Sequence, residues 1–305
     1  MGKYKFYIAD AFTEEIFGGN TAGIVVLEPG DDFPLKEKMI KLAAELKYSE
    51  TVFILPGLEK DSWDFHARYF TPTDEVALCG HATIAGMYVL SKIGMINEGV
   101  YKLKTGAETI DIQVDGSRVI MGMATPENID TIDEPRTISE LYSIMGLTVP
   151  NPSSIGRLKP MLISTGLPDI MLPVSGKKEL DIINPNMKRL SEFSERWNSV
   201  GVHAFTTEFA KENNSEIKAF CRNFAPLYGI DEEAATGTSN GALAYYLHLN
   251  GLLGSDGTLK VIQGEAMHRP SSIDVFLSAD PISQDIVTVR VGGSAVILAE
   301  GKVYL

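Results

Sequence analysis

Residues Phe70 to Leu90, FTPTDEVALCGHATIAGMYVL, decide how this chain folds. The first part has the Thr, Pro and Asp residues of a loop, and the second has small and apolar residues at helical spacing. This pattern predicts a loop leading into a buried helix. The first turn of a helix carries unpartnered N–H groups and the positive end of the helix dipole, so an anion such as a carboxylate can bind there. Gly80 allows close approach and His81 can move a proton; the alternative is an ordinary helix start.

The composition is that of a globular protein with room for two domains. The chain has 305 residues, of which 44% are hydrophobic and 22% charged. The formal net charge of -13 argues against a nucleic acid or an anionic membrane surface as a partner.

The cysteines and the N-terminus bear on the compartment. Cys79 and Cys221 cannot build a disulfide framework and fit a reducing environment. The first residues, MGKYKFYIADAF, lack the apolar core of a signal peptide, and no apolar run is long enough for a membrane helix. We therefore expect a cytoplasmic protein without a membrane partner.

The first half reads as a strand-rich lobe. Apolar patterns predict a helix at 34–46 and strands at 4–12, 22–27, 52–55, 64–69, 99–103, 108–114 and 118–124. Glu50 lies where the helix gives way to the next strand, and a carboxylate there is either solvated or drawn into a cleft. Residues 128–160 are rich in Pro, Ser and Asp and mark the crossing to a second domain.

The second half repeats the first in outline. Phe224–Pro226 (FAP) matches Phe70–Pro72 (FTP), and Gln263–Gly264 matches Thr105–Gly106 before a further strand. A Gly-containing segment, Thr236–Ser239, again precedes a small-residue helix. An echo of such long period predicts two similar lobes, each with one helix entered through a glycine turn.

Two such helix starts that face one cleft can hold a substrate carboxylate. Neutralising the carboxylate stabilises the carbanion or enolate that forms when a proton leaves the neighbouring carbon. The candidates that could carry the proton are Glu50, Cys79, His81 and Glu233, and burial can raise the pKa of a glutamate into the useful range.

Other classes of site find little support. The chain has no nucleophile elbow, Walker motif, dinucleotide fingerprint or zinc-protease motif. Its histidines are scattered without metal-ligand spacing, so we expect no metal site; they are His66, His81, His203, His248 and His268.

Six pieces of the chain resemble, in order, the PhzF family of phenazine biosynthesis. They are DAFTEEIFGGNTAG, YSETVFI, RYFTPTDEVALCGHATIAG, EEAATGTSNGAL, QGEAMHRPS and VGGSAVILAEG. The resemblance implies an α/β (α+β) fold similar to diaminopimelate epimerase, in which each of two lobes curls a mostly antiparallel sheet around a central helix. It implies an active site between the lobes, no metal or organic cofactor, and a homodimer. We expect lobes at 1–125 and 126–289, with the strand at about 290–305 packing back onto the first.

The resemblance also implies roles for individual residues. Glu50 matches the catalytic acid–base glutamate, and His81 matches the active-site histidine. Gly80 and His81 from one lobe, with Gly237 and Thr238 from the other, would donate to the substrate carboxylate. The further site residues that we expect are Glu233 as catalytic, Asn20 and Thr236 as substrate-binding, and Cys79 and Ser49 as pocket-lining.

Two departures from the family pattern concern the second lobe. The family commonly has Asp-Pro-x-Thr-Gly-Ser, where this chain has Glu233 in place of the aspartate and Thr238 in place of the serine. Both changes shift the functional group and put in doubt that the substrate is the dihydro-hydroxyanthranilate of phenazine synthesis. Related epimerases use two thiols. Cys79 matches the first, but the second position falls at Thr236, which has no usable pKa.

The leading hypothesis is therefore an isomerase. Glu50 would take a proton from a small carboxylate substrate and return it elsewhere on the same conjugated system, while His81 and Glu233 polarise or orient it. One alternative is an amino-acid epimerase or racemase with His81 or Glu233 as the second base. The other is a non-catalytic small-molecule binder of the same fold, which would have no need of an acid–base glutamate.

Overall fold

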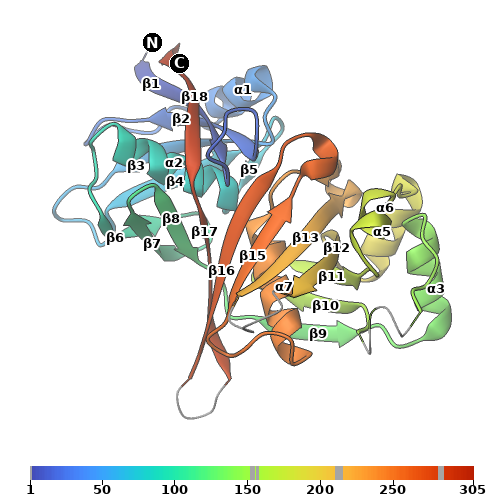
Figure 1. Ribbon diagram of the computed structural model, residues 1–305. Helices are drawn as coiled ribbons and strands as arrows, with labels where there is room; N and C mark the ends of the chain where they lie inside the picture. Colours follow the sequence, from blue (N-terminus) through green and yellow to red (C-terminus); the bar gives the residue numbers. More distant parts are fainter. Residues whose placement is uncertain (1, 152–154, 156–157, 210–215, 281–284) are drawn as a thin grey trace. The chain divides into compact units, whose positions relative to one another are not determined.

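The computed structural model describes residues 2–151, 155, 158–209, 216–280 and 285–305 (Figure 1). The chain divides into two compact units: unit 1 comprises Met1–Gly122 with Gly292–Leu305, and unit 2 comprises Met123–Val291. The units are defined by contacts within the chain, and the domain boundaries at 125/126 and 289/290 stay a prediction. None of the helices in the described residues is both long and apolar enough to cross a membrane.

Unit 1 is a mostly antiparallel sheet with two helices. Its helices are α1 (Lys36–Leu46) and α2 (Gly80–Lys92), and its strands are β1 (Lys3–Ala11), β2 (Asn20–Val26), β3 (Glu50–Pro56), β4 (Phe65–Phe70), β5 (Glu75–Val76), β6 (Gly99–Lys104), β7 (Thr109–Asp115), β8 (Arg118–Gly122) and β18 (Ala295–Tyr304). The strands pair in the order β18–β1–β2–β3–β4–β6–β7–β8, with β5 against β4. Only β2–β3 and β4–β6 are parallel among these pairs.

The central helix α2 is enclosed by this sheet. It contacts β18, β1 and β2 near one end of the strand order and β7 and β8 at the other, so the sheet curls around it. Its sequence is apolar or small on every side, as a fully enclosed helix requires, and most of its residues are buried. The amphipathic helix α1 covers a second apolar cluster around Phe53 and Phe70 on the other face.

Unit 2 is a second sheet of the same kind. Its strands are β9 (Glu127–Thr131), β10 (Met161–Ser164), β11 (Pro168–Pro173), β12 (Gly201–Phe209), β13 (Glu216–Ala225), β14 (Ile230–Glu233), β15 (Thr258–Gln263), β16 (Ser271–Ala279) and β17 (Ile286–Gly293), the last two residues of which belong to unit 1; its helices are α3 (Pro135–Ile144), α5 (Lys177–Asp181), α6 (Met187–Arg196) and α7 (Gly237–Leu249). The order β9–β10–β11–β12–β13–β15–β16, with β14 against β13, again contains two parallel pairs, β11–β12 and β13–β15. The central helix α7 contacts β10, β11, β15 and β16.

The two units repeat one another in side-chain detail. Arg68 on β4 holds Glu75 through two hydrogen bonds of 2.7 and 2.8 Å, and Arg222 on β13 holds Glu232 in the same way at 2.8 Å. Each guanidinium also lies over the phenylalanine two residues further along its strand, 5.3 and 5.0 Å from the ring centroid. The two similar α/β lobes expected from the sequence echo are thereby confirmed.

Candidate active site

The site in unit 1 begins with the connection from β1 to β2, which presents Asn20. Asp10, at the end of β1, is fully buried and needs hydrogen-bond donors. Its carboxylate accepts from the hydroxyl of Thr21 at 2.5 Å and from the backbone N–H of Phe17 at 2.9 Å. These bonds tie the connection to the strand, so Asn20 begins β2 in a fixed, buried position.

Glu50 is delivered by the strand beside β2. Helix α1 ends at Lys47, which adopts a left-handed conformation with φ of 60° and turns the chain back. Glu50 then begins β3, which pairs in parallel with β2 and places Glu50 opposite Ala22. Only 15% of the Glu50 side chain is exposed, and its Oε2 atom is buried. The predicted junction of helix and strand is confirmed.

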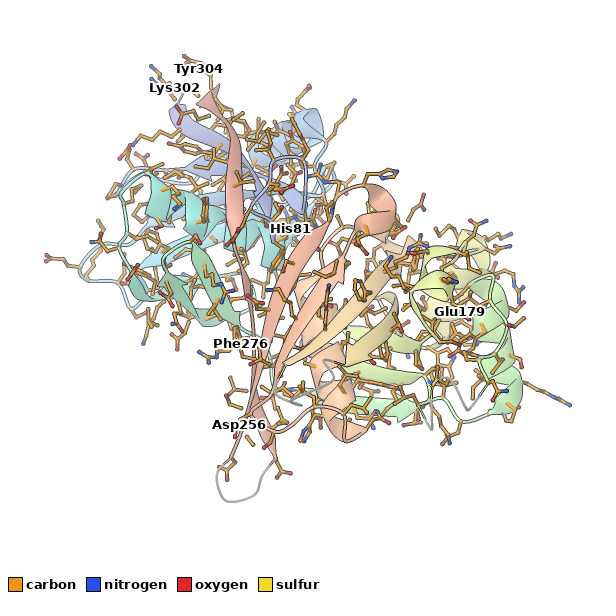
Figure 2. The ribbon with its side chains drawn as sticks, in the orientation of Figure 1. His81, Glu179, Asp256, Phe276, Lys302 and Tyr304 are labelled. Atoms are coloured by element: carbon orange, nitrogen blue, oxygen red, sulfur yellow. The ribbon has the colours of Figure 1, made fainter. Side chains whose placement is uncertain are left out.

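His81 lies at the first turn of α2 and joins these elements (Figure 2). Its Nδ1 atom is 3.2 Å from Asn20 Nδ2, and its Nε2 atom is 3.3 Å from both Glu50 Oε2 and Ser49 Oγ. Cys79, the residue before the helix, places Sγ 3.4 Å from Nδ1. The fold therefore brings together five of the residues that the sequence suggested for the site.

These contacts set the charge of the imidazole. Burial lowers the pKa of His81, and the opposing attraction of Glu50 is the smaller effect. Because Asn20 Nδ2 is a donor, Nδ1 accepts, and the neutral ring carries its hydrogen on Nε2, which has Ser49 Oγ within hydrogen-bonding distance. The arrangement is a neutral histidine in contact with a carboxylate, and the buried Oε2 atom of that carboxylate has no hydrogen-bond partner among the described residues.

Three of these side chains, those of Glu50, Cys79 and His81, are of kinds that bind metal ions. Atoms of Glu50, Cys79 and His81 lie within 4.8 Å of one another, and thiolate, imidazole and carboxylate are zinc ligands. Both ring nitrogens of His81, however, are already in contact with protein groups. An ion would have to displace at least one of these contacts.

Unit 2 places the other predicted residues around the start of α7. Thr236 precedes the first helical residue, Gly237, as Cys79 precedes Gly80 in unit 1. Its hydroxyl donates to Glu233 Oε2 at 2.8 Å, so the side chain orients Glu233. Gly237 is buried and Thr238 is half-buried, with its carbonyl accepting a hydrogen bond from the Thr165 hydroxyl at 2.9 Å.

Some polar residues of both units escaped the sequence analysis. Asp10 was hidden in an apolar strand pattern, although a carboxylate in such a strand is itself a signal that a buried partner exists. Gln263 was noted only because Gln263–Gly264 matches Thr105–Gly106, yet it contacts both Glu233 and Thr236. Neither role shows in local spacing, because the partners lie elsewhere in the chain.

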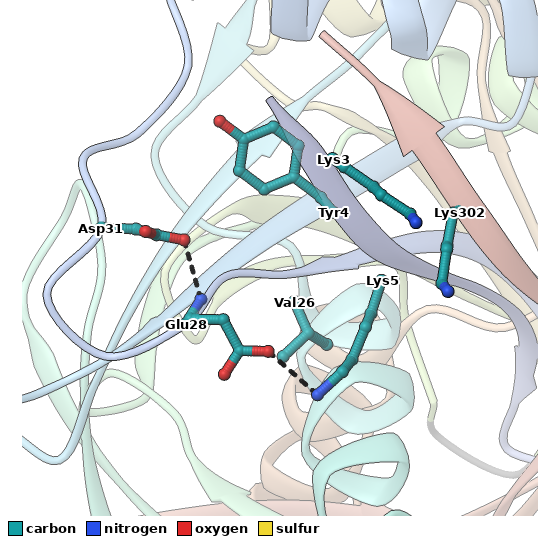
Figure 3. Close-up of a pocket in the computed structure, with 7 residues that line it drawn as sticks. All are labelled: Lys3, Tyr4, Lys5, Val26, Glu28, Asp31 and Lys302. Carbon is teal, nitrogen blue, oxygen red and sulfur yellow. Dashed lines mark hydrogen bonds and ion pairs between the residues drawn. The ribbon is translucent and has the colours of Figure 1, made fainter. Parts of the chain in front are cut away.

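A hollow of about 150 Å³ in unit 1 is lined by residues of β1, β2 and β18 and of the segment after β2 (Figure 3). It is formed by the Val26 end of β2, whereas Asn20 begins the strand at its other end. One of its lysines, Lys5, is paired with Glu28 at 3.0 Å. The hollow has no acid–base group beside a histidine and is not a candidate for the reaction.

Comparison with known proteins agrees with this geometry. The family model of phenazine biosynthesis-like proteins (PhzC-PhzF) matches residues 9–301. The chain belongs to this family. An uncharacterized isomerase of Clostridium acetobutylicum is 33% identical over 99% of both chains, and the trans-2,3-dihydro-3-hydroxyanthranilate isomerase of Pseudomonas fluorescens is 27% identical over 99% of this chain and all of its own. This PhzF-like chain is thus an isomerase by family.

Solved structures support the same fold. A PhzF-family protein of Bacillus anthracis is 26% identical and superposes with a TM-score of 0.84 over the full length of both chains. A hydroxyproline epimerase of Agrobacterium vitis, only 15% identical, matches 99% of this chain and 93% of its own with a TM-score of 0.64 and shows the shared fold alone.

Proposed function

We propose that this PhzF-like isomerase moves a proton between two carbons of a small carboxylate substrate, with Glu50 as the single acid–base group. The reaction class is a 1,3- or 1,5-shift on a conjugated system. The ionised Glu50 takes a proton from an acidic carbon and leaves an enolate. The same carboxyl group then returns the proton to another carbon, so no electron acceptor or donor is needed.

The observation that carries the proposal is the contact of 3.3 Å between Glu50 Oε2 and His81 Nε2. The neutral imidazole lies against the carboxylate and limits its orientations without fixing a proton on it, and the buried Oε2 atom keeps its capacity to accept a proton. The contact is shielded from water because His81 is buried, and electrostatic effects are stronger there than in solution.

The helix starts support binding of the substrate carboxylate. The backbone N–H groups near Gly80 in unit 1 and near Gly237 in unit 2 are of the kind that bind anions. We assign the substrate carboxylate to these groups, because neutralising it lowers the cost of the enolate. Thr238, in the first turn of α7, is assigned to substrate binding on the same grounds, and Asn20 is assigned to it because it lies beside His81.

A racemase with two thiols is the weaker reading. Cys79 and Thr236 occupy the same position relative to their helices. The backbone carbonyl of Cys79 accepts a hydrogen bond from the Thr83 hydroxyl, and that of Thr236 accepts one from Asn240 Nδ2, both at 2.8 Å. The second thiol position is therefore filled by a hydroxyl. Cys221 is buried in β13, and burial raises the pKa of its thiol well above the usual value.

Hydrogen–deuterium exchange in D2O, followed by NMR, tests the proposal. The panel would hold trans-2,3-dihydro-3-hydroxyanthranilate, diaminopimelate and common amino acids, with Glu50→Gln protein as the control. We expect deuterium to enter one carboxylate with wild-type protein and not with the variant. Exchange that persists in the variant would move the base to Cys79, His81 or Glu233 and overturn the assignment.

A further inference from the structure

Unit 2 contains a branched network of buried hydrogen bonds that ends on Glu233. Six side chains in it are at most 2% exposed: Asp169, His203, Asn223, Ser239, Asn240 and Gln263. They reach Thr236 and Glu233 through bonds of 2.7–3.3 Å. Backbone N–H and carbonyl groups in contact with the network determine which side-chain atom donates and which accepts in each bond.

Gln263 is the first residue whose orientation is settled. Its Nε2 atom faces the backbone carbonyl of Glu233 at 2.7 Å, which can only accept. Its Oε1 atom faces the backbone N–H of Thr236 at 3.3 Å, which can only donate. The second hydrogen on Nε2 then goes to the Thr236 hydroxyl at 3.0 Å, and that hydroxyl must direct its own hydrogen to Glu233 Oε2.

Asn240 is settled by the same reasoning. Its Nδ2 atom donates to the backbone carbonyl of Thr236 and to Gln263 Oε1, both at 2.8 Å. Its Oδ1 atom therefore accepts, at 3.1 Å, from Nε2 of His203. The other ring nitrogen of His203 accepts from Asn223 at 3.2 Å, so the ring is neutral with its hydrogen on Nε2.

We propose that Gln263 and Thr236 are positioning residues that hold Glu233 as an ionised hydrogen-bond acceptor, at the end of a one-way chain of donors that starts at Asn223 and His203. Every hydrogen in the chain points toward Glu233, and such bonds polarise and strengthen one another. A second branch runs from Asn223 through Ser239 to Asp169. This inference rests on the proposed function, to which it adds Glu233 as a group that meets the substrate.

Unit 1 shows that the fold does not require this network. Strand pairing places Tyr69 opposite Val76 in unit 1 and Asn223 opposite Glu233 in unit 2. Unit 1 thus has an apolar residue at the position of Glu233, and Tyr69 makes one hydroxyl bond of 2.6 Å to Thr83 of the central helix. The same scaffold therefore forms without this donor chain, and the side chain at its end, Glu233, is one that unit 1 replaces with Val76.

A matched pair of variants at Thr236 tests the direction of the chain. Thr236→Val keeps the shape and removes the hydroxyl hydrogen, whereas Thr236→Ser keeps it. Titration of the Glu233 side-chain carboxyl by carbon-13 NMR should move its midpoint up by about one pH unit in Thr236→Val, because a charge-assisted bond is lost, and by much less in Thr236→Ser. Equal midpoints in wild type and both variants would overturn the proposal.

A second measurement needs no variant and no substrate. Nitrogen-15 shifts of the His203 ring in the intact protein should report a neutral ring with its hydrogen on Nε2 near pH 7. A neutral ring with its hydrogen on Nδ1 would reverse the chain at His203, and a charged ring would break it between Asn223 and His203. Either result would overturn the inference even if both Thr236 variants misfold. These readouts are independent of turnover, so failure of the assignment of Glu50 would leave them unchanged.

Discussion

At the scale of single residues, burial decides the charge of the histidines. His81 lies in the first turn of α2 and His203 on β12, and burial lowers the pKa of both, to about 4 in His203. Each is held neutral by an asparagine on Nδ1, Asn20 in one case and Asn223 in the other. In His81 the remaining nitrogen meets the Glu50 carboxylate, and in His203 it meets the side-chain amide of Asn240.

Two buried groups of unit 2 should give opposite pH dependences of stability. The pKa of His203 is lowered from 6.5 to about 4, so the unfolded chain binds the extra proton and stability falls as the pH drops through this window. Burial raises the pKa of Asp169 from 3.8 to about 6, so the folded chain keeps a proton that the unfolded chain loses, and stability rises as the pH drops from 6 toward 3.8. Each contribution is about 3 kcal/mol.

Urea unfolding at pH 6.5 and pH 4 would separate the two contributions. Relative to the change in wild type, Asp169→Asn should lose about 3 kcal/mol more on going to pH 4, because only the histidine remains, and His203→Gln should gain a similar amount. Shifts of the same sign in both variants would contradict the assignment of these charges.

At the scale of elements, a glycine packs closely against the loop that precedes each central helix. Gly264 follows β15 with φ of +81°, and a Cβ there would lie 2.3 Å from the Arg269 carbonyl oxygen and 2.6 Å from that of Ala234. Gly106 makes the same approach to the backbone of Ala77 in unit 1. The Gly-containing pairs seen in the sequence are thus close contacts that hold the loop before each helix.

Gly264→Ala should destabilise the protein far more than Gly229→Ala. Gly229 has a similar φ of +76° but nothing within 4 Å of an added Cβ, so it carries only the conformational cost of about 1 kcal/mol. Gly264→Ala adds a clash with backbone and should cost several kcal/mol in thermal or urea unfolding. Similar costs at the two positions would show that the close approach does not matter.

The elements that the sequence missed are short or polar. The helix at 34–46, the small-residue helix after Thr236–Ser239 and the longer strands of the first half were predicted within a few residues of their observed limits. Strands β5 and β9 were not, because β5 has two residues and β9 is almost entirely exposed, so neither carries an alternating apolar pattern. They depend on pairing with β4 and β10. Glu50 and His81 were found from motifs, whereas Asp10 and Gln263 act on partners that spacing does not reveal.

At the scale of the whole molecule, the repeated lobes are the feature that the sequence predicted best. The echo of FTP in FAP corresponds to strand ends that carry the same arginine–glutamate pair. The homodimer, the position of the substrate between the lobes and the absence of a metal stay predictions. Contacts between separately folded parts or copies of a chain produce no periodic pattern in the sequence, so periodicity does not predict them.

Activity should survive removal of metal ions. The proposed proton transfer uses Glu50 beside His81, whose ring is oriented by Asn20, and it requires no ion. After prolonged dialysis against EDTA, the exchange rate of the substrate should stay within about twofold of the untreated protein. A loss that zinc restores would instead make Glu50, Cys79 and His81 ligands of a resident ion.

The measurement that tests the central claim most directly compares Glu50→Gln with Glu59→Gln, a change at an exposed glutamate of the same unit. Substrate affinity by calorimetry and deuterium exchange by NMR would be determined on the same samples. We predict that Glu50→Gln slows exchange by roughly 100- to 10,000-fold with little change in affinity, and that Glu59→Gln changes neither. Exchange at the wild-type rate in Glu50→Gln would contradict the assignment of Glu50 as the acid–base group.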